Sequence, residues 1–379
     1  MENLRIGLTY SDVLLVPKKT PLKSRSEANV TSKFSRNVKL NLPIVASNMV
    51  SVCESKMAIA LARVGAIGVI HQFNKIKDQA EEVTKVKRST CYVIDHPLCI
   101  TAGSTIEAAV KVMEEKNVTS LLVTTTGDGH GELQGIFTSR DYLFEENRER
   151  LVREVMTNKE NLIVANPSIS SNEAKQLLHT NRIEKLPLLD ERGKISGLIT
   201  TKDIRKLEQW NNANRDSKGR LVVAAAVGVK DALERAGALV EAGVDVLVLD
   251  IAHCHSDYAI QRIRELKQAF PHIDVVAGNI ATKEAARDLI AAGADGLKVG
   301  IGPSPVCTTR IMSGSGVPQL TAVFDVCQIA KQHGVPVCAD GGITYPGDVA
   351  KALAAGASSI MTGSKFAGCK ESPCMIFTK

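Results

Sequence analysis

Short apolar runs alternate with helix-like segments over most of the chain, and this alternation constrains the fold more than any other feature. In the second half, six runs read as buried strands: 221–227, 244–249, 273–277, 296–299, 335–339 and 358–361. The helical segments between them close with glycine, at Gly243, Gly293, Gly334 and Gly356. Glycine is the preferred residue just beyond a helix, where the backbone turns left-handed. Strands separated by helices in this way indicate a parallel α/β sheet.

Two further apolar runs, 42–47 and 65–71, flank a helical pattern that contains Met57, Ile59 and Leu61. They bring the strands to eight, the number that closes a (β/α)8 TIM barrel. The alternative is an open, doubly wound sheet. That fold needs a Gly-x-Gly-x-x-Gly turn after its first strand, and the sequence has none there. The sequence therefore predicts an α/β protein built on a TIM barrel.

A repeat interrupts the alternation between about Lys85 and Leu207. The segment Gly135–Asp141 recurs as Gly197–Asp203, and a helical stretch and a short strand precede each copy. Two copies of one unit, inserted between strands of another domain, indicate a paired module rather than a long solenoid. The predicted domains are a first barrel part (1–86), the inserted pair (87–207, with copies at about 87–147 and 148–207) and a second barrel part (208–379).

The beginning of the chain carries weaker patterns. Leu8–Pro17 is expected to be an arm that ends in a short strand, and residues 18–40, polar and basic, are expected on the surface. Met1–Arg5 shows no apolar core of a signal peptide, and no apolar run approaches membrane-spanning length. We therefore expect a soluble, cytoplasmic protein without a membrane partner.

The composition limits the classes of ligand and partner that the protein is expected to bind. Aromatic residues make up only 4% of the chain, too few for base stacking on nucleic acid, and the net charge of +6 suits a small anion such as a phosphate. The nine cysteines are scattered without a Cys-x-x-Cys pair. This pattern indicates reduced thiols in a cytosolic protein rather than disulfides or a zinc site.

One cysteine stands out by its loop. The apolar run 296–299 continues into a Gly/Pro/Ser loop that presents Cys307, followed by two threonines and Arg310. A thiol beside polar groups on such a loop is a candidate nucleophile. The alternative is a tight turn whose cysteine is merely half-buried.

Polar residues follow seven of the eight strands, at the end where TIM barrels carry their sites. They are Ser47-Asn48, His71-Gln72, Asp250 with His253 and His255, Gly278-Asn279, Gly302–Arg310, Asp340–Gly342 and Gly363-Ser364. The last two groups follow late strands, a position that favours phosphate binding. Asp250 can accept hydrogen bonds from a ribose diol or cap a helix. The two histidines lack metal-ligand spacing, so they predict no metal site.

These motifs resemble the IMP dehydrogenase/GMP reductase family. The likeness is carried by Cys307–Arg310 after Gly-x-Gly-Pro, and by 8–17, 250–256, 277–279, 314–319, 339–343 and 363–368. The inserted repeat looks like a tandem CBS pair (Bateman module). The resemblance covers nearly the whole chain.

The resemblance implies a purine nucleoside monophosphate substrate, attacked at C2 by Cys307 with help from Thr309. It assigns substrate binding to Ser47, Asp340, Gly342, Gly363 and Ser364, and binding of the cofactor, NADPH or NAD, to Asp250, Asn279, Gly300 and Gly302. It also implies a potassium ion at Gly302, Ser304 and Cys307, regulatory adenine or guanine nucleotides at Asp141 and Asp203, and a homotetramer.

Two branches of the family remain open. Asn48-Met49 resembles the GMP reductases, which convert GMP and NADPH to IMP and ammonia. The alternative is IMP dehydrogenase, which converts IMP, NAD and water to XMP and NADH. This sequence departs from the family pattern at three places. It has Ser304-Pro305 where the family usually has Gly-Ser, Val50 where it usually has Asp, and Cys254 where it usually has Gly. The family also continues past Lys379, with a flap, so a truncated nucleotide-binding protein without catalysis is a second alternative.

Overall fold

The computed structural model describes residues 6–89, 93–304 and 307–373. The chain divides into two compact units, a barrel unit of 1–89 and 212–379 and an inserted unit of 90–211. Within the described residues, every helix is too short or too polar to cross a membrane.

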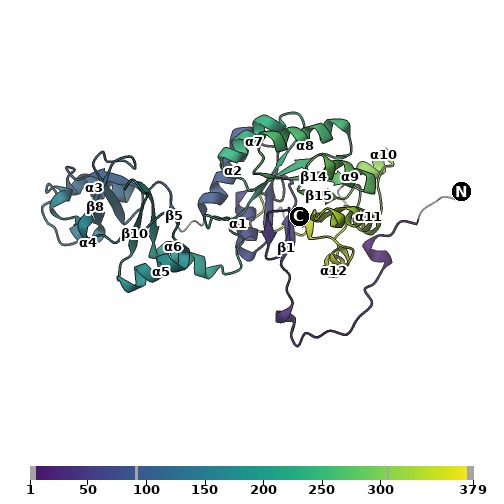
Figure 1. Cartoon of the computed structure of the whole chain (residues 1–379), viewed down its shortest axis with the longest axis horizontal. Helices are drawn as coiled ribbons and strands as arrows, with labels where there is room; N and C mark the ends of the chain where they lie inside the picture. The colour runs from purple at the N-terminus through teal and green to yellow at the C-terminus, as the bar shows by residue number, and fades with distance from the viewer. Residues whose placement is uncertain (1–5, 90–92, 305–306, 374–379) are drawn as a thin grey trace, which may run out of the picture. The chain divides into compact units, whose positions relative to one another are not determined.

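Eight parallel strands close the barrel in the order β12-β13-β14-β15-β16-β17-β3-β4. Their bounds are β3 (Ile44–Ala46), β4 (Ile67–Ile70), β12 (Ala224–Val227), β13 (Val246–Asp250), β14 (Asp274–Ile280), β15 (Gly296–Val299), β16 (Val337–Asp340) and β17 (Ser359–Thr362). Figure 1 shows helices around the outside of these strands. The predicted (β/α)8 TIM barrel is therefore confirmed, with strand ends displaced by at most a few residues.

The helices of the barrel unit follow its strands. They are α1 (Ser55–Val64), α2 (Ile76–Ser89), α7 (Ala232–Glu241), α8 (Asp257–Ala269), α9 (Lys283–Ala291), α10 (Thr309–Ser313), α11 (Gln319–Gln332) and α12 (Pro346–Ala354). The four glycines predicted to close helices all have positive φ, between +61° at Gly334 and +110° at Gly356. The left-handed turn that each one makes redirects the chain into the next strand.

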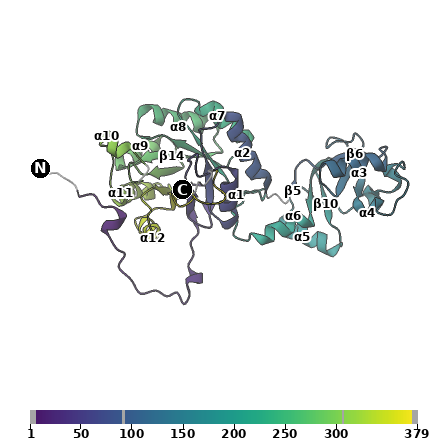
Figure 2. The same ribbon diagram turned by 180° about the vertical axis from the view of Figure 1, so that it is seen from behind.

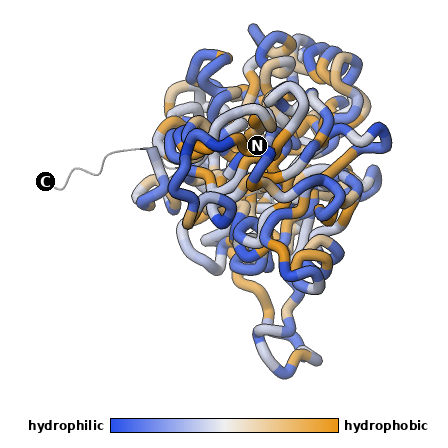
Figure 3. Tube along the Cα trace, turned by 90° about the vertical axis from the view of Figure 1, so that its left-hand side faces the viewer, coloured by the Kyte–Doolittle hydropathy of each residue, from blue (hydrophilic) through white to orange (hydrophobic). Residues whose placement is uncertain are grey.

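The barrel strands are apolar on both faces because one face meets the helices and the other fills the barrel. The inward layer includes Val45, Val69, Val246, Val248 and Met361, all fully buried. The outward layer packs on the helices in a separate, larger cluster. Figure 3 shows the result along the trace, where short hydrophobic stretches are separated by hydrophilic ones.

The first forty residues correct two predictions. No strand forms in 8–17: Thr9 and Asp12 cap a short 3-10 turn instead, Tyr10–Asp12, and the following residues run extended without a partner strand (Figure 2). Residues 18–31 are exposed as expected, but Phe34 and Leu40 are fully buried. Phe34 follows β1 (Ser32–Lys33), and Leu40 ends β2 (Lys39–Leu40), its antiparallel partner. Both side chains join the inward layer of the barrel. A polar segment thus contributes part of the core, since its few apolar side chains fill the barrel interior.

The inserted unit contains two similar sheets, as the repeat implies. One holds β6 (Cys99–Thr101), β7 (Ser120–Thr124), β8 (Leu133–Thr138) and β9 (Thr157–Asn158); the other holds β10 (Lys185–Leu189), β11 (Ile195–Thr200) and β5 (Val93–Ile94). Its helices are α3 (Ile106–Glu115), α4 (Ser139–Tyr142), α5 (Ser171–Thr180) and α6 (Thr201–Gln209). Each sheet packs on its own helices around a small core.

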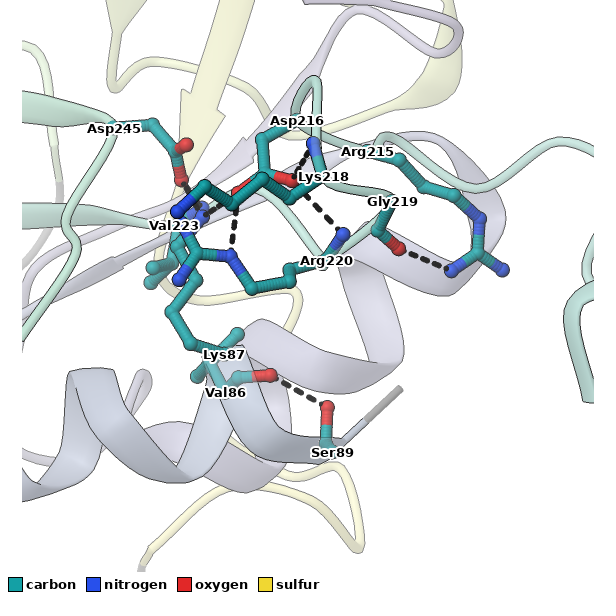
Figure 4. Close-up of polar contacts among 10 residues, drawn as sticks. All are labelled: Val86, Lys87, Ser89, Arg215, Asp216, Lys218, Gly219, Arg220, Val223 and Asp245. Atoms are coloured by element: carbon teal, nitrogen blue, oxygen red, sulfur yellow. Dashed lines mark hydrogen bonds and ion pairs between the residues drawn. The ribbon is translucent and has the colours of Figure 1, made fainter. Parts of the chain in front are cut away.

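A buried ionic cluster lies where the barrel unit is interrupted by the insertion. Lys87, near the end of α2, is only 4% exposed, and its Nζ lies 2.6 Å from Oδ2 of Asp245 and 3.1 Å from Oδ2 of Asp216. Arg220 donates to Asp216, and the backbone N–H of Val223 donates to Asp245 (Figure 4). The cluster joins α2 to the segment that re-enters the barrel and to the start of β13.

Candidate active site

A cavity of about 1030 Å³ opens at the carboxyl ends of the barrel strands. Its lining includes Gly300 and residues from five predicted groups: Ser47, Asn279, Gly302, Ser304, Cys307, Asp340, Gly342, Gly363 and Ser364. These residues follow β3, β14, β15, β16 and β17, so the barrel gathers side chains that are far apart in sequence. A cavity of this size accommodates a nucleotide-sized ligand.

Cys307 faces this cavity in a half-buried position. Hydrogen bonds from the Thr309 side chain, and from backbone groups of Thr309 and Gly302, lower the pKa of its thiol, although partial burial opposes the shift. By contrast, burial raises the pKa of Cys254, Cys327 and Cys338 to about 12. Because the thiolate is the nucleophilic form, Cys307 differs chemically from these buried thiols. Cys307 as the nucleophile stays a prediction.

Thr309 begins α10, two residues beyond Cys307. Helix α10 is short, and the backbone N–H of Cys307 donates to the Ser304 carbonyl at 3.0 Å, which closes the loop in front of it. Pro305, the predicted departure from the family pattern, lies outside the described residues.

Asp340 ends β16 with one carboxylate oxygen anchored. Its Oδ2 accepts a hydrogen bond from Nδ2 of Asn279 at 2.9 Å, and its backbone carbonyl accepts one from Nε2 of Gln319 at 3.1 Å. Oδ1 has no hydrogen-bond partner among the described residues, and Asp340 lines the cavity. A free acceptor on a fixed carboxylate is suited to a hydroxyl pair of a ligand.

Lys298 is a buried cation at this end of the barrel that the sequence patterns did not identify. Its side chain is 2% exposed, and its Nζ donates to Oδ1 of Asp250 at 2.7 Å, to Oδ2 of Asp340 at 3.2 Å and to Oδ1 of Asn279. Burial opposes its charge, but the two carboxylates raise its pKa above the usual value. A lysine inside an apolar strand was the available signal, since lysine is almost never fully buried unless it is paired.

Asp250 belongs to this network rather than to the cavity lining. Its Oδ1 accepts from Lys298, and its Oδ2 accepts from Nδ2 of Asn48 at 2.7 Å. The helix-cap alternative for Asp250 is wrong, because Ser256 caps α8 through its own side chain. Both oxygens of Asp250 are therefore held in place, each by a different strand end.

The opposite side of the cavity is formed around β17. A Cβ added to Gly363 would meet Sδ of Met49 at 2.7 Å and Cβ of Ser47 at 3.5 Å, so the turns after β3 and β17 lie in contact. Three cationic side chains also line the cavity: Arg310, Lys351 and Lys365. Lys351 is paired with Asp348, which also lines the cavity, so Arg310 and Lys365 are the cations that favour an anionic ligand.

Two predicted residues lie in the inserted unit, apart from the barrel site. Asp141 accepts from the backbone N–H and the hydroxyl of Thr138, at 2.6 and 3.0 Å, and Asp203 accepts from the hydroxyl of Thr200. Asp141 therefore completes a capping box at the start of α4, and at the start of α6 the backbone N–H of Asp203 donates to the Thr200 hydroxyl at 3.3 Å. The matching geometry reflects the sequence repeat.

No group of three or more His, Cys, Asp and Glu side chains that could hold a metal ion occurs within residues 6–89, 93–304 and 307–373. His253 lies near His255, which pairs with Asp288 at 2.8 Å. All seven cysteines in the same part of the chain are free thiols.

Comparisons with known proteins identify the family of this chain. The model of the IMP dehydrogenase/GMP reductase domain matches residues 7–379. An inosine-5'-monophosphate dehydrogenase of Nitrosopumilus maritimus is 50% identical over 374 residues, which cover 98% of this chain and 77% of that protein. A GMP reductase of Leishmania major is 46% identical over 380 residues, with coverage of 98% and 77%.

Solved structures give the same result. The crystal structure of GMP reductase from Trypanosoma brucei in complex with guanosine 5'-monophosphate has a TM-score of 0.86 and 42% identity, and the match covers 100% of this chain and 80% of that one. The structure of the same enzyme with guanosine 5'-triphosphate has a TM-score of 0.85 and 44% identity, with coverage of 98% and 89%. The chain therefore belongs to the IMP dehydrogenase/GMP reductase family and is an NAD(P)-dependent oxidoreductase of purine nucleotides.

Proposed function

We propose that this protein acts at C2 of a purine nucleoside monophosphate through a covalent bond to Cys307, and that it is a GMP reductase. The observation that carries the proposal is the lowered pKa of the Cys307 thiol, which lines a nucleotide-sized cavity. A lower pKa increases the fraction of thiolate at a given pH, and the thiolate is the nucleophile.

The nucleotide is placed by charge and hydrogen bonding. The free Oδ1 of Asp340 accepts from the ribose hydroxyls, while Ser47, Gly342, Gly363 and Ser364 hold the phosphate, with Arg310 and Lys365 nearby. Backbone N–H groups and cations are the common ligands of phosphate at the late strands of a barrel. This placement leaves the base directed toward Cys307.

The reaction then follows from the thiolate. Sγ of Cys307 adds to C2 of GMP, and the 2-amino group leaves as ammonia after it gains a proton. Asp250, Asn279, Gly300 and Gly302 would hold NADPH, which would supply the hydride to C2. The C2–S bond then breaks, releasing IMP and the Cys307 thiolate. Overall, GMP, NADPH and two protons give IMP, NADP+ and ammonium.

Thr309 has a positioning part in this scheme. Its hydroxyl stabilises the Cys307 thiolate by a hydrogen bond and adjoins the C2 substituent, where ammonia leaves. Asn48 supports the reductase direction, since the Asn48-Met49 pair resembles that branch, as does the likeness to the Trypanosoma brucei enzyme.

The second candidate is IMP dehydrogenase. It is favoured by the 50% identity to the Nitrosopumilus maritimus protein. The same Cys307 adduct would form on IMP, hydride would pass from C2 to NAD+, and water would then displace the thiolate to give XMP. Both candidate activities use the same residues, so only an assay of the reaction can distinguish a GMP reductase from an IMP dehydrogenase.

For the inserted unit we propose a CBS pair that binds regulatory adenine or guanine nucleotides. The equivalent positions of Asp141 and Asp203, each following a threonine by three residues at a strand end, support this assignment. For the barrel loop, a potassium ion held by carbonyls of Gly302, Ser304 and Cys307 stays a prediction.

The deciding experiment is a paired assay of the purified protein. With GMP and NADPH, we expect the near-ultraviolet absorbance of NADPH to fall while ammonia and IMP appear in equal amounts. With IMP and NAD+, we expect no NADH. The reverse pattern, with XMP formed, would assign the dehydrogenase instead. Cys307→Ala should abolish the reaction, whereas Cys369→Ala, at another half-buried free thiol, should leave it unchanged.

A further inference from the structure

Lys298 connects two groups of residues that serve different ligands. Asp340 belongs to the nucleotide side of the site, whereas Asp250 and Asn279 belong to the cofactor side. The ammonium of Lys298 donates to all three, at 2.7 Å to Asp250 and 3.2 Å to Asp340. An ammonium has three protons, so its donors are fully used.

The connection spans four neighbouring strands. Asp250 ends β13, Asn279 lies in β14, Lys298 in β15 and Asp340 ends β16. Asn279 adds a second link, because its Nδ2 donates to Asp340 Oδ2 at 2.9 Å and to the carbonyl of Gly300 at 2.7 Å. A displacement of Asp340 therefore changes the hydrogen bonds of the cofactor side through two residues.

The array has little freedom to absorb such a displacement. Lys298 is 2% exposed, and a Cβ added to Gly278 would lie 2.4 Å from Cβ of Lys298, so the stem of the lysine is packed against the neighbouring strand. Asn48 holds the far oxygen of Asp250 at 2.7 Å. In this buried place, water cannot replace a lost partner of the ammonium.

From these contacts we propose that Lys298 is a positioning residue that couples nucleotide binding to cofactor binding. A nucleotide that fixes Asp340 also fixes the ammonium, and the ammonium fixes Asp250 and Asn279 for the cofactor. This inference rests on the proposed function for the identity of the two ligands. It assigns to Lys298 no contact with either ligand.

The barrel supplies a matched control. Lys87 is also a buried lysine between two aspartates, 4% exposed, but its partner Asp245 precedes β13, whereas Asp250 ends that strand. Removing either ammonium takes the lysine partner away from two part-buried carboxylates, so both variants should lose stability. Only the Lys298 variant should change the linkage between ligands.

The test is calorimetric titration of the full chain with two ligand pairs that cannot react, GMP with NADP+ and XMP with NAD+. In the wild type we expect saturating nucleotide to tighten cofactor binding by at least about 5-fold for one pair, within the usual range of coupling between sites. In Lys298→Met the factor should fall below about 2-fold, with nucleotide alone still bound. Lys87→Met should keep the wild-type factor.

A second variant covers the chance that Lys298→Met does not fold. Asp250→Asn keeps the shape of the side chain and leaves Lys298 paired with Asp340, and we expect the same loss of coupling. Unchanged coupling in the folded variants, or a wild type that binds both ligands independently, would overturn the inference. A protein that binds with coupling but turns over neither substrate would overturn only the proposed function, while one that binds no nucleotide would overturn both.

Discussion

A Cβ placed on Gly300 would lie 2.1 Å from the carbonyl oxygen of Asp340, so the backbones at the ends of β15 and β16 are in direct contact. Gly300 also has a φ of +156°, a conformation that other residues rarely adopt. The strand that leads into the Cys307 loop can lie this close to Asp340 only because position 300 has no side chain.

Gly300→Ala should therefore damage the fold and the site together. We expect a loss of about 1–3 kcal/mol in the free energy of unfolding, as is usual when a methyl group is forced into a packed region. Since the clash displaces Asp340, nucleotide binding should weaken as well. Thermal unfolding and nucleotide titration of the variant check both effects.

Gly347→Ala is the matched control, because a Cβ there meets nothing within 4 Å and the residue lies in α12. It should leave stability unchanged or raise it by up to about 1 kcal/mol, since alanine restricts the unfolded chain. Equal destabilisation by the two substitutions would show that the contact with Asp340 is not the cause.

The buried cluster at Lys87 gives a prediction about how the two chain segments of the barrel unit are held together. Lys87→Met leaves Asp245 buried beside the start of β12 with only the Val223 N–H as a partner. We expect a loss of about 3–5 kcal/mol, the usual result of removing one member of a buried ion pair. Chemical denaturation followed by circular dichroism measures it.

Lys85→Met serves as the control on the same helix. Lys85 pairs with Glu82 at 2.6 Å, but its side chain is 54% exposed. An exposed pair of this kind contributes less than about 1 kcal/mol. A Lys87 variant no less stable than the Lys85 variant would mean that the cluster does not hold α2 to the re-entering chain.

Much of the barrel could be predicted because its signals are local. Apolar runs of four to seven residues mark the strands, and the glycines that end the helices mark where each turn begins. The burial of residues in segment 18–40 could not be predicted from such local signals. Phe34 and Leu40 are buried by strands from the rest of the barrel, and nothing in the polar sequence around them shows that contact.

The same limit applies to the site. Cys307, Asp340 and Gly363 follow predicted strands, so the rule that barrel sites lie at strand ends locates them. Lys298 lies inside a strand, and only the three-dimensional proximity of Asp250 and Asp340 explains its burial. A functional role for an interior residue depends on partners from other strands, which the linear pattern does not contain.

The reactivity of Cys307 should distinguish it from the other described thiols. Its pKa is lowered, chiefly by the Thr309 hydroxyl, whereas burial raises that of Cys99 to about 11 and that of Cys254, Cys327 and Cys338 to about 12. Alkylation requires the thiolate, so its rate follows the thiolate fraction as the pH rises.

With iodoacetamide, and with sites assigned by peptide mass spectrometry, we expect the rate at Cys307 to rise with pH and to reach half its plateau below the usual thiol pKa. Thr309→Val removes the hydroxyl that stabilises the thiolate, so the midpoint should move to higher pH and the rate near neutrality should fall about 3- to 10-fold. Thr308→Val, one residue earlier and exposed, is the control and should leave the midpoint unchanged.

GMP or IMP should slow the labelling, because the nucleotide would occupy the cavity that Cys307 faces. A midpoint that does not respond to Thr309→Val would contradict the assigned hydrogen bond, and labelling that neither nucleotide slows would contradict the placement of the substrate.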